Sequence, residues 1–173
     1  SPGEERQLLE IARRLADSLK IKGIFDIEVI SHKGQLKLLE IDARLPSQTP
    51  IAVYHSTGMN MVEMLVNLAV GNAEKVGMLP AKQVCIYQQI WVGRGKIRGL
   101  GGHMMGSCKG LKIRRGFFGC VEAITDYEHG RTDWKAIVIV TGADKREAEK
   151  SFLGFIRRMK KETRIENWEL VEG

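Results

Sequence analysis

The sequence predicts an α+β fold with a mainly antiparallel sheet and flanking helices. Two short β-type runs, IFDIEVIS and LKLLEID, are joined by the residues HKGQ, whose length and glycine are typical of a hairpin loop. Before and after this hairpin, apolar residues recur at steps of three and four, as they do on one face of a helix. Paired β runs with helices between them favour antiparallel pairing.

The first helix is predicted to begin at the N-terminus and to end near Gly23. Ser1 supplies a capping hydroxyl, Pro2 suits a first turn, and the acids at positions 4 and 5 face the positive end of the helix dipole. Its apolar stripe consists of Leu8, Ile11, Leu15 and Leu19.

The hairpin that follows carries acidic residues at alternate positions. Asp26 and Glu28 share one face of the first strand, because side chains alternate along a strand. By the same rule, Leu38, Glu40, Asp42 and Arg44 share one face of the second strand. Antiparallel pairing can bring Glu28 next to Glu40 or Asp42.

After the hairpin we expect a loop over 45–57 and a second helix over 59–70. This helix is nearly apolar throughout, so it should be deeply packed, and Gly71 is a natural stop. VCIYQQIWVG then predicts a long strand, RGLGGHMMGSCKG irregular turns, and WKAIVIVTG a late strand. Asp144 caps a last helix through KREAEKSFLGFIRRMKK. A polar stretch over 72–82 favours a division into residues 1–75 and 76–173.

Composition narrows the class of protein. With 173 residues, 43% hydrophobic and 28% charged, the chain can bury a core of its own, and its longest apolar run is far shorter than the roughly 20 residues of a membrane helix. Three cysteines without CxxC spacing fit reduced thiols, as in a cytoplasmic protein. The net charge of +6 suits anionic small substrates such as nucleotides. A nucleic-acid partner is not favoured, because the basic residues are dispersed apart from clusters at 94–98 and 109–115 and are not interleaved with aromatic residues.

The acids of the hairpin require compensation if they converge. Like charges that share a site repel and lose solvation, so a cation is expected between them. Glu and Asp oxygens without His or Cys favour a hard cation such as Mg²⁺, and Arg44 offers a planar fork for a phosphate or a carboxylate. Spacing alone leaves open a solvated strand face with ordinary ion pairs.

A resemblance adds to this interpretation. The segment GIFDIEVISHKGQLKLLEIDARLPSQTP resembles the metal-binding end of ATP-grasp ligases. More narrowly, LKLLEIDARLPSQTPIAVYHSTGMNMVEMLVNL and RRGFFGCVEAITDY resemble the branch of that family that joins lysine to 3-methylornithine in pyrrolysine biosynthesis. The resemblance implies the C-terminal lobe of an ATP-grasp fold, followed by a small α+β subdomain.

The resemblance implies roles for individual residues. Glu28 and Glu40 match the metal-ligating acids of the family, and Asp42 stands where most members have asparagine. Arg44 matches the arginine that faces the transferred phosphate, which makes it the catalytic candidate, and Asp26 is a candidate for binding a substrate amine. The loop that lines the amino-acid pocket would contribute Ser47, Gln48, Thr49 and His55, with Tyr54 and Ser56 able to complete it.

The activity that the resemblance implies uses ATP and Mg²⁺. A substrate carboxylate attacks the γ-phosphate of ATP to give an acyl phosphate, which an amine then displaces to form an amide. The nucleotide-covering lobes of such ligases would lie upstream of Ser1, so we expect the chain to be a C-terminal part that is inactive without those N-terminal lobes. The partners expected are amino-acid substrates, ATP and the N-terminal lobes, with a homo-oligomer also open and no membrane.

Other interpretations stay open from the sequence. The ligase could be carbamoyl-phosphate-synthase-like or D-alanine-ligase-like, or the chain could be a non-catalytic basic binding module. RGKIRGLGGHMMG contains no GK[ST], and no amphipathic helix opens after it, so it does not match a phosphate loop. Its glycines are expected to form turns, with Met104 and Met105 packing inward. Core packing is the role expected for Trp91, Phe117, Phe118 and Trp134.

Overall fold

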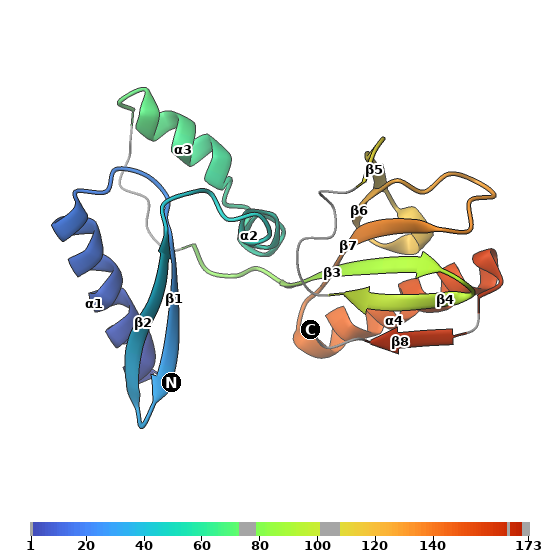
Figure 1. Cartoon of the computed structure of the whole chain (residues 1–173), viewed down its shortest axis with the longest axis horizontal. Coiled ribbons are helices and arrows are strands. Elements are labelled where there is room, and N and C mark those ends of the chain that lie inside the picture. Colours follow the sequence, from blue (N-terminus) through green and yellow to red (C-terminus); the bar gives the residue numbers. More distant parts are fainter. Residues whose placement is uncertain (1, 73–78, 101–107, 166, 171–173) are drawn as a thin grey trace. The chain divides into compact units, whose positions relative to one another are not determined.

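The computed structural model describes residues 2–72, 79–100, 108–165 and 167–170, and for the last of these segments only the backbone. Contacts between residues divide the chain into two units (Figure 1). The first unit comprises residues 1–50 and 59–78, and the second comprises residues 51–58 and 79–173. Both units combine helices with strands that pair mainly antiparallel, so the predicted α+β class is confirmed at this level. The predicted division at residue 75 stays a prediction.

The first unit contains the predicted first helix and the predicted hairpin, and the helix packs on the hairpin. Helix α1 spans Pro2–Leu19, and strands β1 (Asp26–His32) and β2 (Gln35–Asp42) pair antiparallel. The loop between the strands has two residues at positive φ, of which the second is a glycine, as hairpin turns favour. The Gln7 side chain donates to Gly34 O (3.1 Å) and accepts from Leu36 N (3.1 Å), which fixes α1 to β2.

Helix α3 spans Met61–Ala69 and confirms the predicted second helix, but not its burial. The side chain of Asn60 accepts from the Glu63 amide, and Gly71 follows the helix at φ 81°, where glycine is favoured. None of its residues is buried. Val62, Val66 and the following Val70 are each more than half exposed. The expectation of deep packing was therefore wrong, because a nearly apolar sequence does not by itself supply a surface to pack against.

Residues predicted as a loop instead form helix α2, Thr49–Thr57. Pro50 stands in its first turn, where a missing N–H is harmless. At the other end, the hydroxyls of Ser56 and Thr57 donate to carbonyl oxygens one turn back, and Gly58 follows at φ 84°. The Gln83 side chain donates to His55 O at 2.7 Å, a contact within the second unit.

The second unit is built on a six-stranded sheet with the strand order β5-β6-β7-β3-β4-β8. Its strands are β3 (Val84–Gly93), β4 (Lys96–Leu100), β5 (Lys112–Arg115), β6 (Glu122–Thr125), β7 (Trp134–Gly142) and β8 (Asn167–Leu170). All neighbours pair antiparallel except β4 with β8. The predicted strands β3 and β7 are confirmed and lie side by side.

One part of this sheet differs from what the sequence predicted. Residues 98–100 were expected to be irregular, but they belong to β4, which pairs with β3. Arg94 and Gly95, both at positive φ, make the two-residue turn that joins the strands, and this turn was not recognised. His103, Met104 and Met105 lie outside the described residues.

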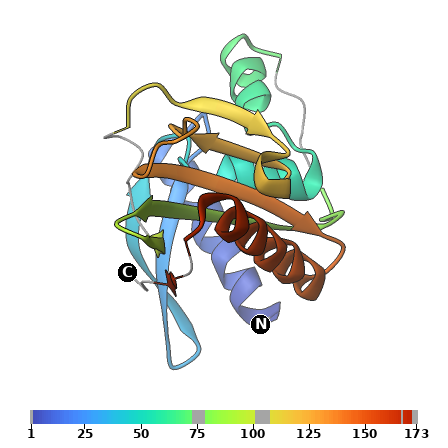
Figure 2. The same cartoon turned by 90° about the vertical axis from the view of Figure 1, so that its right-hand side faces the viewer.

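Helix α4, Lys145–Thr163, lies along one face of the sheet (Figure 2). As predicted, Asp144 caps it by accepting from the Glu147 amide (2.8 Å), and the Glu147 side chain accepts in return from the Ala143 amide (2.7 Å). Buried hydrophobic residues between α4, β3, β4 and β7 form the core, in which Trp134 and Phe117 take the predicted places. Phe117 and Phe118 belong to a 3-10 turn, η2 (Phe117–Gly119), rather than to a strand. None of the described helices is both long enough and apolar enough to span a bilayer.

Candidate functional site

The hairpin of the first unit brings the predicted acids together in two facing pairs. Glu28 lies opposite Glu40 in the register of β1 and β2, and Asp26 lies opposite Asp42. Directly opposed residues of an antiparallel pair project to the same face, with Cβ atoms about 5 Å apart. Since Asp26 and Glu28 are two residues apart, all four carboxylates project from the same face at the open end of the hairpin.

A β-bulge separates this acidic end from the hairpin turn. Val29 pairs with Leu38 and Glu28 pairs with Glu40, so Leu39 is an extra residue without a partner on β1. Leu38 therefore lies on the face of Val29, and the prediction that it shares a face with Glu40 was wrong. The doublet Leu38-Leu39, which breaks the alternation of polar and apolar residues, is the sequence signal that could have found the bulge.

Arg44 lies two residues beyond the end of β2. Its guanidinium forms an ion pair with the Asp42 carboxylate, and its backbone amide donates to Asp42 O at 2.9 Å. Both side chains keep solvent contact, so the pair orients the guanidinium more than it stabilises the fold. The structure thus brings Arg44 to the acidic face, as the sequence predicted.

The acidic face has the chemistry that a hard cation prefers, but it is not a preformed metal site. Its ligand atoms are carboxylate oxygens only, which suit Mg²⁺. Over the described part of the chain, no basic side chain forms an ion pair with Asp26, Glu28 or Glu40. Among the same residues, no three or more potential ligands lie close enough together to hold a metal ion. The carboxylates therefore fit a divalent cation whose remaining ligands come from water or from a bound phosphate.

The residues predicted to line an amino-acid pocket fall in both units. Ser47, Gln48 and Thr49 are exposed and lie in the first unit. His55 is half-buried in the last turn of α2, in the second unit, with the Tyr54 ring edge-on to it at 5.6 Å. The hydroxyl of Ser56 is engaged with the backbone of its own helix. Their role in binding a substrate stays a prediction.

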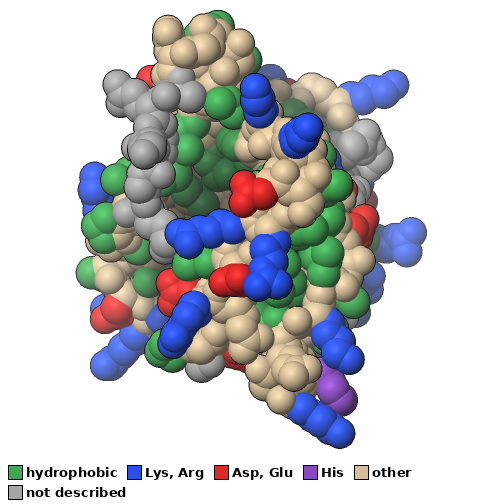
Figure 3. Space-filling model, turned by 90° about the vertical axis from the view of Figure 1, so that its left-hand side faces the viewer, with side chains coloured by type: hydrophobic (Ala, Val, Ile, Leu, Met, Phe, Trp, Pro, Cys, Tyr) green, Lys and Arg blue, Asp and Glu red, His purple; other side chains and the backbone are tan. Residues whose placement is uncertain are grey.

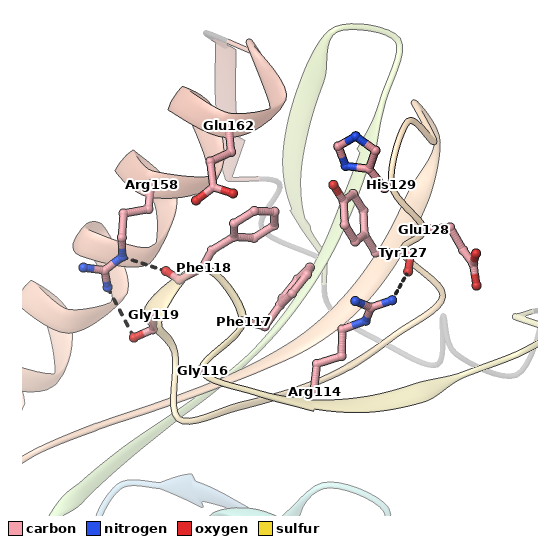
Figure 4. Close-up of a pocket in the computed structure, with 10 residues that line it drawn as sticks. All are labelled: Arg114, Gly116, Phe117, Phe118, Gly119, Tyr127, Glu128, His129, Arg158 and Glu162. Atoms are coloured by element: carbon pink, nitrogen blue, oxygen red, sulfur yellow. Dashed lines mark hydrogen bonds between the residues drawn. The ribbon is translucent and has the colours of Figure 1, made fainter.

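A pocket that the sequence did not predict lies in the second unit, beside η2 (Figure 4). It has a volume of about 560 Å³, and Phe118 and Tyr127 contribute aromatic walls. Arg158 donates to Phe118 O (2.8 Å) and Gly119 O (3.2 Å), and Arg114 donates to Tyr127 O (2.9 Å). The two guanidinium groups thus hold the walls in place through backbone carbonyls. The glycines of RRGFFG, at positive φ on either side of the two phenylalanines, are the sequence signal of this turn.

Comparison with known proteins supports the predicted resemblance. No family model matches the chain. Over 81 residues, 47% of this chain, it is 47% identical to proteins named 3-methyl-D-ornithine–L-lysine ligase from Methanosarcina mazei and Methanosarcina acetivorans, and covers 22% of each. It is 39% identical over 88 residues, 51% of the chain, to the protein of the same name from Methanosarcina barkeri, and covers 24% of it.

Solved structures with a similar fold are much larger proteins. The urea amidolyase of K. lactis and the urea carboxylase of Kluyveromyces lactis each match 82% of this chain with a TM-score of 0.52. The identity is 17%, which shows a likeness of fold alone, and the match covers 9% and 13% of those chains. The chain spans about a fifth of the length of the curated relatives it matches. Over about half of its own length it resembles 3-methyl-D-ornithine–L-lysine ligases, as the hairpin motif predicted.

Proposed function

We propose that the chain is the C-terminal part of an ATP-dependent carboxylate–amine ligase that joins lysine to 3-methylornithine. The observation that carries this proposal is the set of four carboxylates on one face of the β1–β2 hairpin, in a chain whose curated relatives bear the name of such a ligase. An ATP-grasp ligase with other substrates would use the same acids, but the names of the relatives favour lysine and 3-methylornithine.

In this proposal the acidic face holds Mg²⁺ for the nucleotide. Glu28 and Glu40 are the first ligands, because they face each other directly across the two strands, and Asp42 is the third. The bound cation would neutralise the charge of the ATP phosphates while the phosphoryl group is transferred. Asp26, beside Asp42 but without an assigned metal role, binds the ammonium group of a substrate.

Arg44 positions the transferred phosphate. Its guanidinium lies at the edge of the acidic face because Asp42 holds it there. A guanidinium can bind two oxygen atoms of one phosphate, which fixes the orientation of the group under attack. Ser47, Gln48, Thr49 and His55 contribute polar contacts to the amino-acid substrate.

The surface of the first unit supports the proposal that further lobes complete the enzyme. Large apolar side chains are exposed on α1, on the hairpin and on α3, among them Leu9 (43%), Leu39 (64%) and Val66 (55%). Figure 3 shows hydrophobic side chains reaching the surface between Lys and Arg on this side of the molecule. Exposed apolar area of this kind is typical of a surface that another part of a protein covers. The chain alone is therefore expected to lack ligase activity and to bind ATP weakly.

The metal site is tested by titrating the chain with Mg²⁺ in the presence and absence of a non-hydrolysable ATP analogue, followed by NMR. Glu40→Gln should weaken Mg²⁺ binding by about tenfold or more, because a directly facing carboxylate is lost. The same variant should not unfold, since it removes a like-charge pair. Glu149→Gln, which neutralises an exposed acid on α4, is the matched control. Unchanged Mg²⁺ affinity in Glu40→Gln would refute the assignment.

The assignment of activity is tested separately, by ADP release from ATP. The chain should release no ADP in response to lysine and 3-methyl-D-ornithine. A longer polypeptide that carries this chain behind N-terminal lobes of the relatives should release ADP only when the amino acids are supplied. Lysine-dependent ADP release by the chain alone would contradict the expectation that the N-terminal lobes are required.

A further inference from the structure

The outer side of α4 carries a row of basic residues that the proposed ligase chemistry does not use. The row consists of Arg146, Lys150, Arg157 and Lys161, all exposed, and Leu153 lies at its centre. Successive members are four, three, four and four residues apart, so they lie on one stripe of the helix, about 22 Å long. We call these five residues the basic stripe. The buried side of α4, which includes Phe155 and Met159, packs on the core of the second unit.

Glu147 and Glu149 stand three residues from Lys150 and Arg146 of the stripe, but both acids bind other partners. Glu147 accepts from the Ala143 amide at the start of the helix, and Glu149 pairs with Lys145 (3.9 Å). Figure 4 shows Glu162 directed toward Phe118, on another side of the helix. Surface helices usually intersperse opposite charges four residues apart, which stabilises them in isolation.

The four cations of the stripe are therefore uncompensated. Within the described residues, none of them forms an ion pair with an acid. They are four of the 27 Lys and Arg residues of a chain whose net charge is +6. A row of like charges on one helix is destabilising by itself, so it calls for a partner with the opposite charge.

We propose that the basic stripe is a docking surface for an acidic segment of another protein. An acidic protein segment and a nucleic acid could both bind the four cations, and Leu153, which is 56% exposed, favours the protein segment. It stands between two pairs of cations and offers an apolar contact at the centre of the surface, an arrangement of apolar centre and charged rim that protein interfaces share. A nucleic-acid backbone is bound through its phosphates and gains little from a leucine. The partner segment would therefore present Asp or Glu side chains on both sides of an apolar residue.

The test measures binding of two labelled peptides by fluorescence anisotropy, one with repeated Glu-Glu-Leu and the other with repeated Glu-Glu-Ser. The chain should bind the leucine peptide more tightly. Changing the stripe with Lys150→Glu, Arg157→Glu and Lys161→Glu together should weaken this binding by about tenfold or more. Leu153→Ser should weaken binding of the leucine peptide and leave that of the serine peptide unchanged.

The matched control carries the same change of charge elsewhere, with Arg13→Glu, Lys22→Glu and Lys37→Glu on exposed positions of the first unit. It should keep the affinity of the unchanged chain for both peptides, and urea unfolding should show that both triple variants are folded. Equal loss in the control would overturn the proposal, because general electrostatic attraction would then explain the binding. Tighter binding of a short RNA duplex than of either peptide, lost on changing the stripe, would also overturn it.

Discussion

At the scale of single residues, loss of the ion pair between Asp42 and Arg44 should affect activity much more than stability. Both side chains are accessible to solvent, which screens their attraction. Arg44→Ala should therefore change the free energy of unfolding by less than about 1 kcal/mol, measured by urea denaturation of the chain. In a ligase that contains the chain, the same variant should lower kcat, because the guanidinium is assigned to the transferred phosphate. A large loss of stability would show instead that Arg44 is a structural residue.

Cys120 offers a second prediction at this scale. Burial raises the pKa of its thiol to about 11, so the thiol stays protonated at neutral pH and reacts slowly. Alkylation of Cys120, followed by peptide mass spectrometry, should be slow at pH 8 and should accelerate as the pH rises past 10. In urea, where burial is lost, it should be alkylated readily at pH 8. Rapid alkylation of the folded chain at pH 8 would contradict the buried position of this thiol.

The same pKa shift predicts how stability depends on pH. Folding raises the pKa of the Cys120 thiol above its ordinary value of 9.0, so below pH 9 the thiol is protonated in both the folded and the unfolded chain. Between pH 9 and pH 11 the unfolded chain loses this proton more readily, and the contribution of Cys120 to stability is lost as the pH rises. In urea denaturation over this range, Cys120→Ala should show a smaller decline in unfolding free energy than the unchanged chain.

At the scale of elements, the sequence predicts those helices and turns that depend on residues close together in the chain. The spacing of apolar residues predicts α1 and α3, the cap Asp144 predicts α4, and the glycine turn predicts the β1–β2 hairpin. The cap of α3, Asn60, was not predicted. α2 was missed because its start at a proline also fits a loop, and β4 because glycine-rich sequence was interpreted as irregular. Alternation predicted that the acids of each strand share a face, but it left the partner of Glu28 open between Glu40 and Asp42. The register that pairs it with Glu40, and the bulge at Leu39, depend on the partner strand.

Two glycines on either side of the sheet–helix contact give a prediction for these elements. A Cβ on Gly142, at the end of β7, would lie 2.2 Å from the backbone nitrogen of Ala148 in α4. Gly142→Ala should therefore destabilise the chain by about 1–3 kcal/mol, because backbone cannot move aside cheaply. Gly154→Ala, in the interior of α4, meets nothing closer than the Arg158 guanidinium at 3.7 Å and should stabilise it by about 0.5–1 kcal/mol. Urea denaturation measures both, and an equal effect of the two variants would contradict the close packing at Gly142.

At the scale of the whole molecule, burial is distributed unevenly between the two units. Apart from Pro46 in the first unit, the buried hydrophobic side chains of the described residues lie between Ile90 and Met159, in the second unit. The first unit holds its elements together through the contact of α1 with the hairpin and through exposed hydrogen bonds, such as those of Gln7. Since buried apolar area supplies most of the free energy of folding, the second unit should be the more stable one.

Hydrogen–deuterium exchange tests this difference directly. Backbone amides of β3, β7 and α4 should exchange slowly, because their opening requires the core to be exposed, while those of β1, β2 and α3 should exchange much faster. If lobes of a longer ligase cover the apolar side chains of the first unit, joining those lobes to the chain should slow exchange in β1, β2 and α3 and leave the second unit unchanged. Equal protection of both units in the chain alone would show that the first unit is stable without a cover, and would remove the structural argument for the additional lobes.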